Sequence, residues 1–246
     1  MPHRRFTDVP PGTGPLRPRL VLRHARGMLR ARTGRIAGAA FVFFVPPAAL
    51  FFGAEFVRDA RADADGTNRW ILLAAVIAVA SLFRLLGEVF FAGFLDLAIG
   101  DDYFRGERRN LREVLQDLPW RPLVVVDVVV NVGAAIGLAL FVVPGLVVYV
   151  LLGLVGPVVV QERRGAWDAM RRTARISRPH WFLVLALVVI PLGVEHALAE
   201  LVRELVHDDG LLIVISAEWL IAVTMLALVG VVEVALATEL MARSPE

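Results

Sequence analysis

The chain has 246 residues, of which 57% are hydrophobic and 20% charged, and its mean hydropathy is +0.66. Long apolar runs alternate with short charged stretches, a segregation that a lipid bilayer requires and a soluble core does not. The absence of cysteine excludes disulfides, thiolate metal sites and cysteine nucleophiles. All 26 Lys and Arg positions hold arginine, and the arginines flank apolar runs, so the basic pI of about 9.8 indicates membrane orientation and no nucleic-acid partner.

Residues 1–18 form a tail rich in arginine and proline, which we expect to be disordered and cytoplasmic. A spanning helix needs about 20 mostly apolar residues. The sequence predicts six such helices in a single domain over 19–246, at 36–57, 70–99, 122–143, 145–160, 181–206 and 211–240. The fourth is the shortest. Pro144-Gly145 predicts a tight turn between the third and fourth spans, and therefore an antiparallel hairpin.

Arginine counts predict the orientation of these spans. Arginines crowd the N-terminal tail, the segment from Arg105 to Arg121 and the segment from Arg163 to Arg178. The alternate loops are poorer in arginine, and acids balance it there. With six spans the three arginine-rich segments lie on one side, which the positive-inside rule makes the cytoplasm. We therefore expect a multi-pass protein of the bacterial inner membrane with both termini cytoplasmic.

An amphipathic helix precedes each predicted hairpin, around 21–29, 111–118 and 167–175. Such helices lie in the headgroup plane with their arginines toward anionic lipid phosphates. The fold class expected is therefore all-α, with six transmembrane helices as three hairpins, each after an interfacial amphipathic helix. The residues expected to contact anionic lipid or a protein partner are Arg108, Arg109, Arg112, Arg163, Arg164, Trp167, Arg171, Arg172 and Arg175.

The stretch from Val143 to Trp181 resembles a known family. It contains a Pro-Gly turn, an apolar helix, a glutamate, a small basic loop and a tryptophan that opens the next span. The matching residues are Glu162, Gly165, Ala169, Met170, Arg171, Arg172 and Trp181, while Thr173 stands where the family has serine. This pattern is similar to the membrane domain found beside some glycerophosphoryl diester phosphodiesterases and to stand-alone six-helix bacterial membrane proteins. The resemblance covers about residues 140 to 190. It implies fold and location, not hydrolysis, because the predicted spans occupy the chain.

Ionisable residues inside apolar runs are costly and often functional. Arg84 and Glu88 lie four residues apart on the second span, and Asp127 and Asn131 lie four apart on the third, which places each pair on one helix face. A second polar layer comprises Glu195, His196 and Glu218. The first cluster is open to two interpretations: a relay or headgroup site for transport, or a neutralised network that fixes helix packing. Asp101 and Asp102 are expected to form a solvated helix end, and Asp96, Glu233 and Glu239 to be interfacial.

The sequence holds no nucleophile elbow and no paired histidine spacing for a metal. We therefore expect no catalytic activity, metal or cofactor. The leading hypothesis is an accessory or organising membrane protein that binds anionic lipid or a partner protein at the cytoplasmic face. The alternative is a transporter or lipid-handling protein that uses the polar cluster of the second and third spans.

Overall fold

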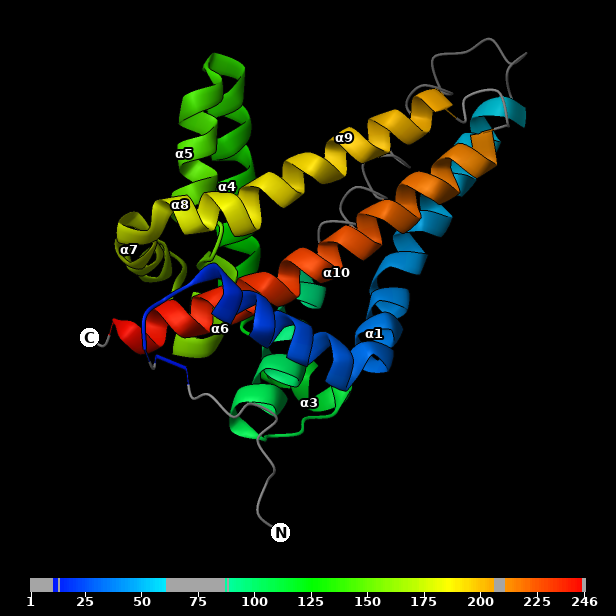
Figure 1. The fold of residues 1–246 in the computed structure, drawn as a ribbon. Helices are drawn as coiled ribbons and strands as arrows, with labels where there is room; N and C mark the ends of the chain where they lie inside the picture. The colour runs from blue at the N-terminus through cyan, green and yellow to red at the C-terminus, as the bar shows by residue number, and fades with distance from the viewer. Residues whose placement is uncertain (1–10, 13, 61–86, 88, 206–210, 245–246) are drawn as a thin grey trace.

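The computed structural model describes residues 11–12, 14–60, 87, 89–205 and 211–244, and the regular secondary structure in these residues is helical throughout (Figure 1). The predicted all-α class is confirmed. A helix satisfies its backbone hydrogen bonds within its own segment, as hydrocarbon surroundings demand. Three of the described stretches are long and apolar enough to cross a membrane: Val143–Glu162, Ala166–Val202 and Ser216–Arg243.

Helix α1 (Pro18–Ala60) consists of two helical segments joined by a kink at Arg32, whose φ of −138° and ψ of 22° are not helical. Before the kink, one face buries Val21, Ala25 and Met28, while the arginines among them are exposed. After the kink the helix changes direction (Figure 1). The predicted amphipathic segment is therefore separated from the apolar run that begins near Ile36.

The next described elements are the π-helix η1 (Leu95–Arg105) and the short helix α3 (Leu111–Asp117). Gly106 ends η1 in the left-handed conformation with a φ of 74°, and the chain then turns back along η1. At the start of α3, the Asn110 N–H donates to Glu113 Oε2 at 2.8 Å. Helix α3 lies within the second predicted amphipathic segment.

Helices α4 (Trp120–Leu140) and α5 (Val142–Leu152) pack side by side, and the turn between them lies earlier than Pro144-Gly145 (Figure 1). Phe141 is the extended residue that joins them, with φ −158° and ψ 146°. Pro144 lies in the first turn of α5, where its missing N–H costs no helical hydrogen bond. Gly137 allows the two helices to pack closely there, because a Cβ on Gly137 would lie 2.6 Å from the Gly145 nitrogen.

The remaining elements, in chain order, are α6 (Val155–Glu162), α7 (Ala166–Ser177), η2 (Arg178–His180), α8 (Trp181–Val184), η3 (Leu185–Val189), α9 (Ile190–Leu205) and α10 (Leu211–Arg243). Helices α5 and α6 together make up the candidate span Val143–Glu162, so the fourth apolar run is long enough to cross a membrane. Arg163 ends this run with a φ of 53°. Helix α7 coincides with the third predicted amphipathic segment.

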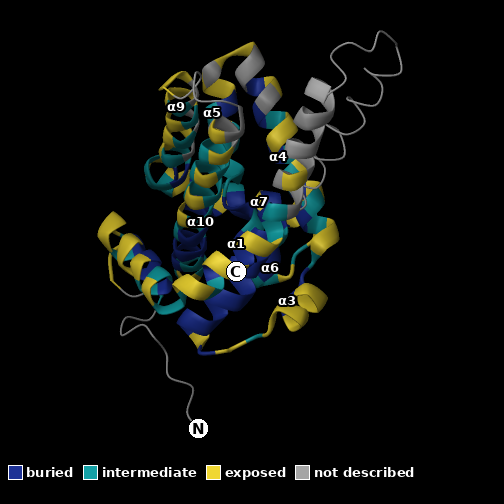
Figure 2. Cartoon of the chain, turned by 90° about the vertical axis from the view of Figure 1, so that its right-hand side faces the viewer, coloured by how far each residue is buried: buried dark blue, intermediate teal, exposed yellow. Residues whose placement is uncertain are grey.

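Burial is unevenly distributed along the bundle. Buried residues concentrate where the first part of α1, η1, α6 and the C-terminal part of α10 pack together, whereas the far ends of α4, α5 and α9 are largely exposed (Figure 2). The exposed side chains there are apolar and recur at helical spacing: Val128, Val132, Ile136 and Leu140 on α4, and Ile190, Val194, Leu198, Leu201 and Leu205 on α9. Soluble monomers rarely expose apolar faces of this extent. These faces fit a hydrocarbon environment.

Candidate functional site at the arginine-rich end

Three arginine-rich segments meet at one end of the molecule: the first part of α1, the segment from η1 to α3, and the loop between α6 and α7. We call this region the arginine-rich end. The Arg35 guanidinium donates from Nη2 to the Arg109 carbonyl oxygen at 2.6 Å, and Arg163 Nη1 donates to the Asp117 carbonyl oxygen at 3.1 Å. Segments far apart in the sequence are thereby linked, in agreement with the prediction that they share one side.

Asp102 lies at the centre of the first charge cluster. It is 1% exposed. Its Oδ2 lies 2.5 Å from Arg32 Nε and 3.3 Å from Arg35 Nη1, and its Oδ1 lies 3.8 Å from Arg108 Nε. Arg32 occupies the kink of α1, so the departure from helical geometry occurs where its side chain reaches this carboxylate. Three guanidinium groups therefore surround one buried acid.

The adjacent Asp101 is buried as well, which corrects the expectation that both acids form a solvated helix end. Arg105 Nη1 lies 2.8 Å from Asp101 Oδ1, and Arg109 Nη2 lies 3.4 Å from Oδ2. Burial raises the pKa of Asp101 above its ordinary value, and the charges of Arg105 and Arg109 oppose that shift. The sequence could not show this burial, because the turn at Gly106 folds the basic segment back over η1.

A second buried cluster joins the two ends of the described chain. Glu239, expected to be interfacial, is 0% exposed. Its Oε1 lies 3.1 Å from His24 Nε2, its Oε2 accepts the Gly12 N–H at 3.1 Å, and it forms an ion pair with Arg243. Arg243 in turn donates from Nη2 to the Gly14 carbonyl at 3.2 Å. The segment before α1 is therefore bound to the last turns of α10.

His24 completes this cluster from α1. Its Nδ1 lies 3.5 Å from the Tyr103 hydroxyl, and its ring packs edge-on against Phe104. Burial lowers the pKa of His24, and the charges of Arg23 and Arg243 lower it further. A neutral imidazole fits this position, with Nε2–H toward the Glu239 carboxylate and Nδ1 accepting from Tyr103.

Glu162 organises the third cluster, between α6, α7 and the end of α10. Arg164 forms an ion pair with it, and Arg172 Nε lies 3.2 Å from its Oε1. Arg172 also donates to the Ser244 carbonyl oxygen. Arg172, expected on the lipid-contacting face, is 6% exposed and belongs to the interior instead. The helical spacing on α7 did not predict the burial of Arg172, because its partner Glu162 lies on another helix.

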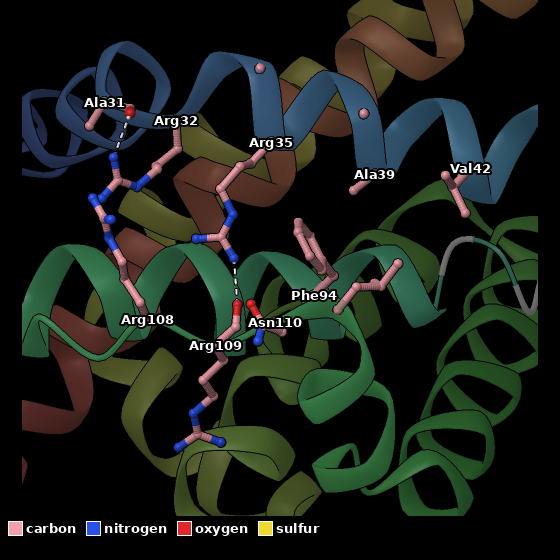
Figure 3. A pocket seen from close by; sticks show the side chains of 12 residues that line it. Ala31, Arg32, Arg35, Ala39, Val42, Phe94, Arg108, Arg109 and Asn110 are labelled. Atoms are coloured by element: carbon pink, nitrogen blue, oxygen red, sulfur yellow. Dashed lines mark hydrogen bonds between the residues drawn. The ribbon is translucent and has the colours of Figure 1, made fainter.

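A groove of about 820 Å³ opens beside the Asp102 cluster, between α1 and the segment after η1 (Figure 3). Arg32, Arg35, Arg108 and Arg109 contribute to its lining at one end. Small and apolar residues line the rest: Ala31, Gly34, Gly38, Ala39, Val42, Phe94 and Leu111, with Asn110 beside them. Figure 3 shows Arg32 and Arg108 extending toward one another from opposite walls. Ligand pockets commonly measure about 300–1,000 Å³, so the groove is large enough for a small-molecule or lipid headgroup.

The predicted polar cluster is only partly described. Arg84 and Glu88 lie outside the described residues. Asp127 and Asn131 share a face of α4, where Asn131 Nδ2 donates to the Asp127 carbonyl at 3.0 Å and the Tyr149 hydroxyl donates to Asn131 Oδ1 at 3.4 Å. In the second layer, Glu195 on α9 and Glu218 on α10 are both half-buried, and these two helices pack together. The side chain of His196 lies outside the described residues.

The other residues that the sequence analysis expected to contact lipid differ in exposure. Arg108 is 71% exposed and Trp167 is 66% exposed. Arg112, Arg163, Arg171 and Arg175 are exposed too, whereas Arg109 and Arg164 are half-buried in ion pairs. Sequence reasoning missed the inner set of Arg32, Arg35, His24, Asp102 and Glu239. The available signal was an acidic doublet directly after an apolar run and arginines three residues apart on α1.

The sequence analysis also did not predict a polar contact inside the bundle, between α6, η1 and α10. Gln161 on α6 donates to Asp96 Oδ1 on η1 at 2.6 Å and to the Thr238 hydroxyl on α10 at 3.1 Å. Asp96 is buried, which corrects its expected interfacial position. Glu233 on α10 is half-buried and interacts electrostatically with Asp96 and Asp127.

Comparison of the chain with protein-family models, with curated proteins and with solved structures found no match to any of the three.

Proposed function

We propose that this chain is a non-enzymatic integral membrane protein that crosses the bacterial inner membrane six times and binds anionic lipid along a cytoplasmic, arginine-rich end. In this proposal it serves as an accessory or organising protein, and it belongs with the six-helix membrane proteins that residues 140–190 resemble. The observation that carries the proposal is the gathering of exposed arginines at one end of a bundle whose described helices α4 and α9 expose apolar faces.

The contacts between the two chain ends support an even number of crossings. The Gly12 N–H binds Glu239, and Arg243 binds the Gly14 carbonyl. Residues bonded in this way lie on the same side of a bilayer, and a chain that returns to its starting side has crossed an even number of times. Six spans satisfy this condition, and the arginine bias favours the cytoplasm as the shared side.

Tryptophans support the placement of the arginine-rich end at the membrane surface. Trp120 and Trp181 open α4 and α8, Trp167 lies in the first turn of α7, and all three are exposed. Tryptophan is enriched at the level of the lipid headgroups, where its ring is apolar and its N–H is polar. Arg121 lies over the Trp120 ring at 5.2 Å, at the boundary between the basic and apolar surfaces. Arginine near such a boundary attracts anionic lipid by about 1 kcal/mol for each residue.

Lipid titration of the purified full chain tests the proposal. The chain in neutral detergent is titrated with phosphatidylglycerol or phosphatidylcholine, and bound lipid is counted by native mass spectrometry. We expect preferential binding of phosphatidylglycerol, and a smaller preference for the double variant Arg171→Gln/Arg175→Gln. Arg171→Lys/Arg175→Lys, which keeps both charges, is the matched control and is expected to bind as the natural chain does. Equal binding of the two lipids by the natural chain refutes the proposal.

A second candidate function is transport of a proton, a cation or a polar lipid group. Acidic side chains from three elements support it: Asp96 on η1, Asp127 on α4 and Glu233 on α10 interact across the bundle. Intramembrane acids of this kind often serve proton or ion pathways. Proteoliposomes with an internal pH dye test it, because transport predicts an acidification rate that Glu233→Gln lowers and Glu107→Gln leaves unchanged. A rate equal to that of protein-free vesicles excludes proton transport.

A further inference from the structure

We propose that the groove between α1 and the segment after η1 binds one anionic phospholipid, with its phosphate at Arg32, Arg35 and Arg108 and an acyl chain along Gly38, Ala39 and Phe94. This inference deepens the proposed function and rests on it in one respect, that the groove opens at the level of the lipid headgroups. It goes further by assigning one lipid to a single site in the groove, distinct from the exposed arginines of α7.

The arginine side chains at the polar end of the groove favour the binding of an anion. Three guanidinium groups gather around the single carboxylate of Asp102, and the most exposed of them, Arg108, is the one farthest from it. Asp102 is buried beneath them, and the contact with Arg108 Nε at 3.8 Å is longer than a hydrogen bond. Arg32 and Arg108 nevertheless extend toward one another (Figure 3). Guanidinium groups repel at close range, and a phosphate between them would accept several charge-assisted hydrogen bonds.

The groove wall changes from charged to apolar along α1. Gly34 and Gly38 lie on the face of α1 that lines the groove, and a Cβ on either would meet nothing within 4 Å. Ala39 and the exposed Val42 continue this face toward the apolar part of the helix. The open space along this face suits a chain of methylene groups.

Phe94 marks the boundary between the two halves. The Arg35 guanidinium carbon lies 6.0 Å from the centre of the Phe94 ring, within the range of a cation–π contact. The same guanidinium reaches Asp102 at 3.3 Å and the Arg109 carbonyl at 2.6 Å. Arg35 is therefore held at the point where a phospholipid passes from phosphate to acyl chain. A free phosphate would use only the polar half, and the apolar half favours a lipid.

Two variants test the two halves of the site separately. Gly38→Leu fills the apolar half and changes no charge, and it raises helix propensity, so the fold is expected to be retained. Arg108→Gln removes the most exposed phosphate ligand. Gly193→Leu is the matched control, because Gly193 is also open, with nothing within 4 Å of a Cβ, but lies on α9. Arg171→Gln is the control for loss of a positive charge outside the groove.

The readout is native mass spectrometry of the detergent-solubilised full chain titrated with dioleoyl phosphatidylglycerol. We expect one lipid to bind more tightly than the others. Arg108→Gln is expected to weaken that first lipid about tenfold, as the loss of one charge-assisted hydrogen bond does. Gly38→Leu is expected to weaken it as well, because the leucine side chain occupies the space of the acyl chain. Gly193→Leu and Arg171→Gln are expected to keep it. Thermal unfolding of each variant in the same detergent shows whether the fold is intact.

Three outcomes overturn the inference. If Gly38→Leu, folded, binds the first lipid as the natural chain does, the groove is not the site. If inorganic phosphate or glycerol 1-phosphate at millimolar concentration displaces the first lipid completely, the groove takes a soluble phosphate and not a phospholipid. If no first lipid is distinguishable while phosphatidylglycerol is still preferred over phosphatidylcholine, the single site fails but the proposed function stands. Loss of that preference itself is the failure of the proposed function.

Discussion

Replacing Glu239 by alanine removes the carboxylate that joins the N-terminal segment to the end of α10. The Gly12 N–H and the Arg243 guanidinium lose their acceptor, and His24 Nε2 loses a carboxylate oxygen that lies 3.1 Å away. Glu239 and His24 are both buried, so water does not readily replace the lost acceptor. The substitution therefore removes a buried negative charge from beside His24 and the largely buried Arg243.

Removal of one partner from a buried ion pair costs about 3–5 kcal/mol. Arg243 retains its bond to the Glu239 carbonyl oxygen at 2.9 Å and to Gly14, because neither uses the removed side chain. We therefore expect a loss of about 3 kcal/mol in the free energy of unfolding, at the lower end of that range. A chain of this size loses about 2–4 °C in Tm for each kcal/mol, which corresponds to about 6–12 °C.

Thermal unfolding in detergent and limited trypsin digestion measure the two consequences. The Tm is expected to fall, and cleavage after Arg19 in the first turn of α1 to accelerate, because the segment before α1 has lost its attachment to α10. Glu107→Ala is the matched control: this acid is 55% exposed and pairs with Arg109 at the surface, so its loss is expected to cost less than about 1 kcal/mol. Equal Tm values for the two variants would refute the reasoning that the buried junction stabilises the fold.

Three further predictions concern other parts of the molecule. Asp102→Asn removes the negative charge that both Arg32 and Arg35 contact, and we expect a loss of about 2–3 kcal/mol in the free energy of unfolding in detergent; an unchanged Tm would show that this carboxylate does not stabilise the fold. Gly137→Leu forces the α4–α5 hairpin apart, because its Cβ would lie 2.6 Å from the Gly145 nitrogen. A disulfide between cysteines introduced on the two helices is then expected to form more slowly, a clean measurement in a chain without native cysteine. Finally, the lowered pKa of His24 means that below pH about 6.5 the unfolded chain binds a proton that the folded chain does not, so stability falls with acidification until the folded pKa is reached, by at most about 1.4 kcal/mol for each pH unit. His24→Gln is expected to flatten this part of the stability profile, and an unaltered profile would assign the slope to other groups.

Much of the architecture followed from patterns along the chain. The lengths of the apolar runs predicted helices, and the arginine blocks predicted that three segments lie on the same side of the membrane. The structure describes helices over five of the six expected runs, in α1, α4, α5, α9 and α10. The amphipathic periodicity around Leu111 and Trp167 predicted α3 and α7. These features are local, because a helix in hydrocarbon satisfies its own backbone and its pattern of exposure repeats every turn.

The pairing of charges did not follow from the sequence. Nothing local distinguishes Arg171, which is exposed on α7, from its neighbour Arg172, which is buried against Glu162. The turn of the hairpin was also predicted three residues late, at Pro144 and not at Phe141, since proline is compatible with either a turn or the first turn of a helix.

Composition, run length and the order of charges were thus sufficient to predict an all-helical membrane protein with its arginines gathered at one end. Only the folded chain shows that Asp102 and Glu239 lie inside that end, each holding basic residues from distant helices. The reason is that the free energy of a buried charge depends on the partner that reaches it. His24 and Glu239 are separated by more than two hundred residues, and only tertiary packing brings them within 3.1 Å.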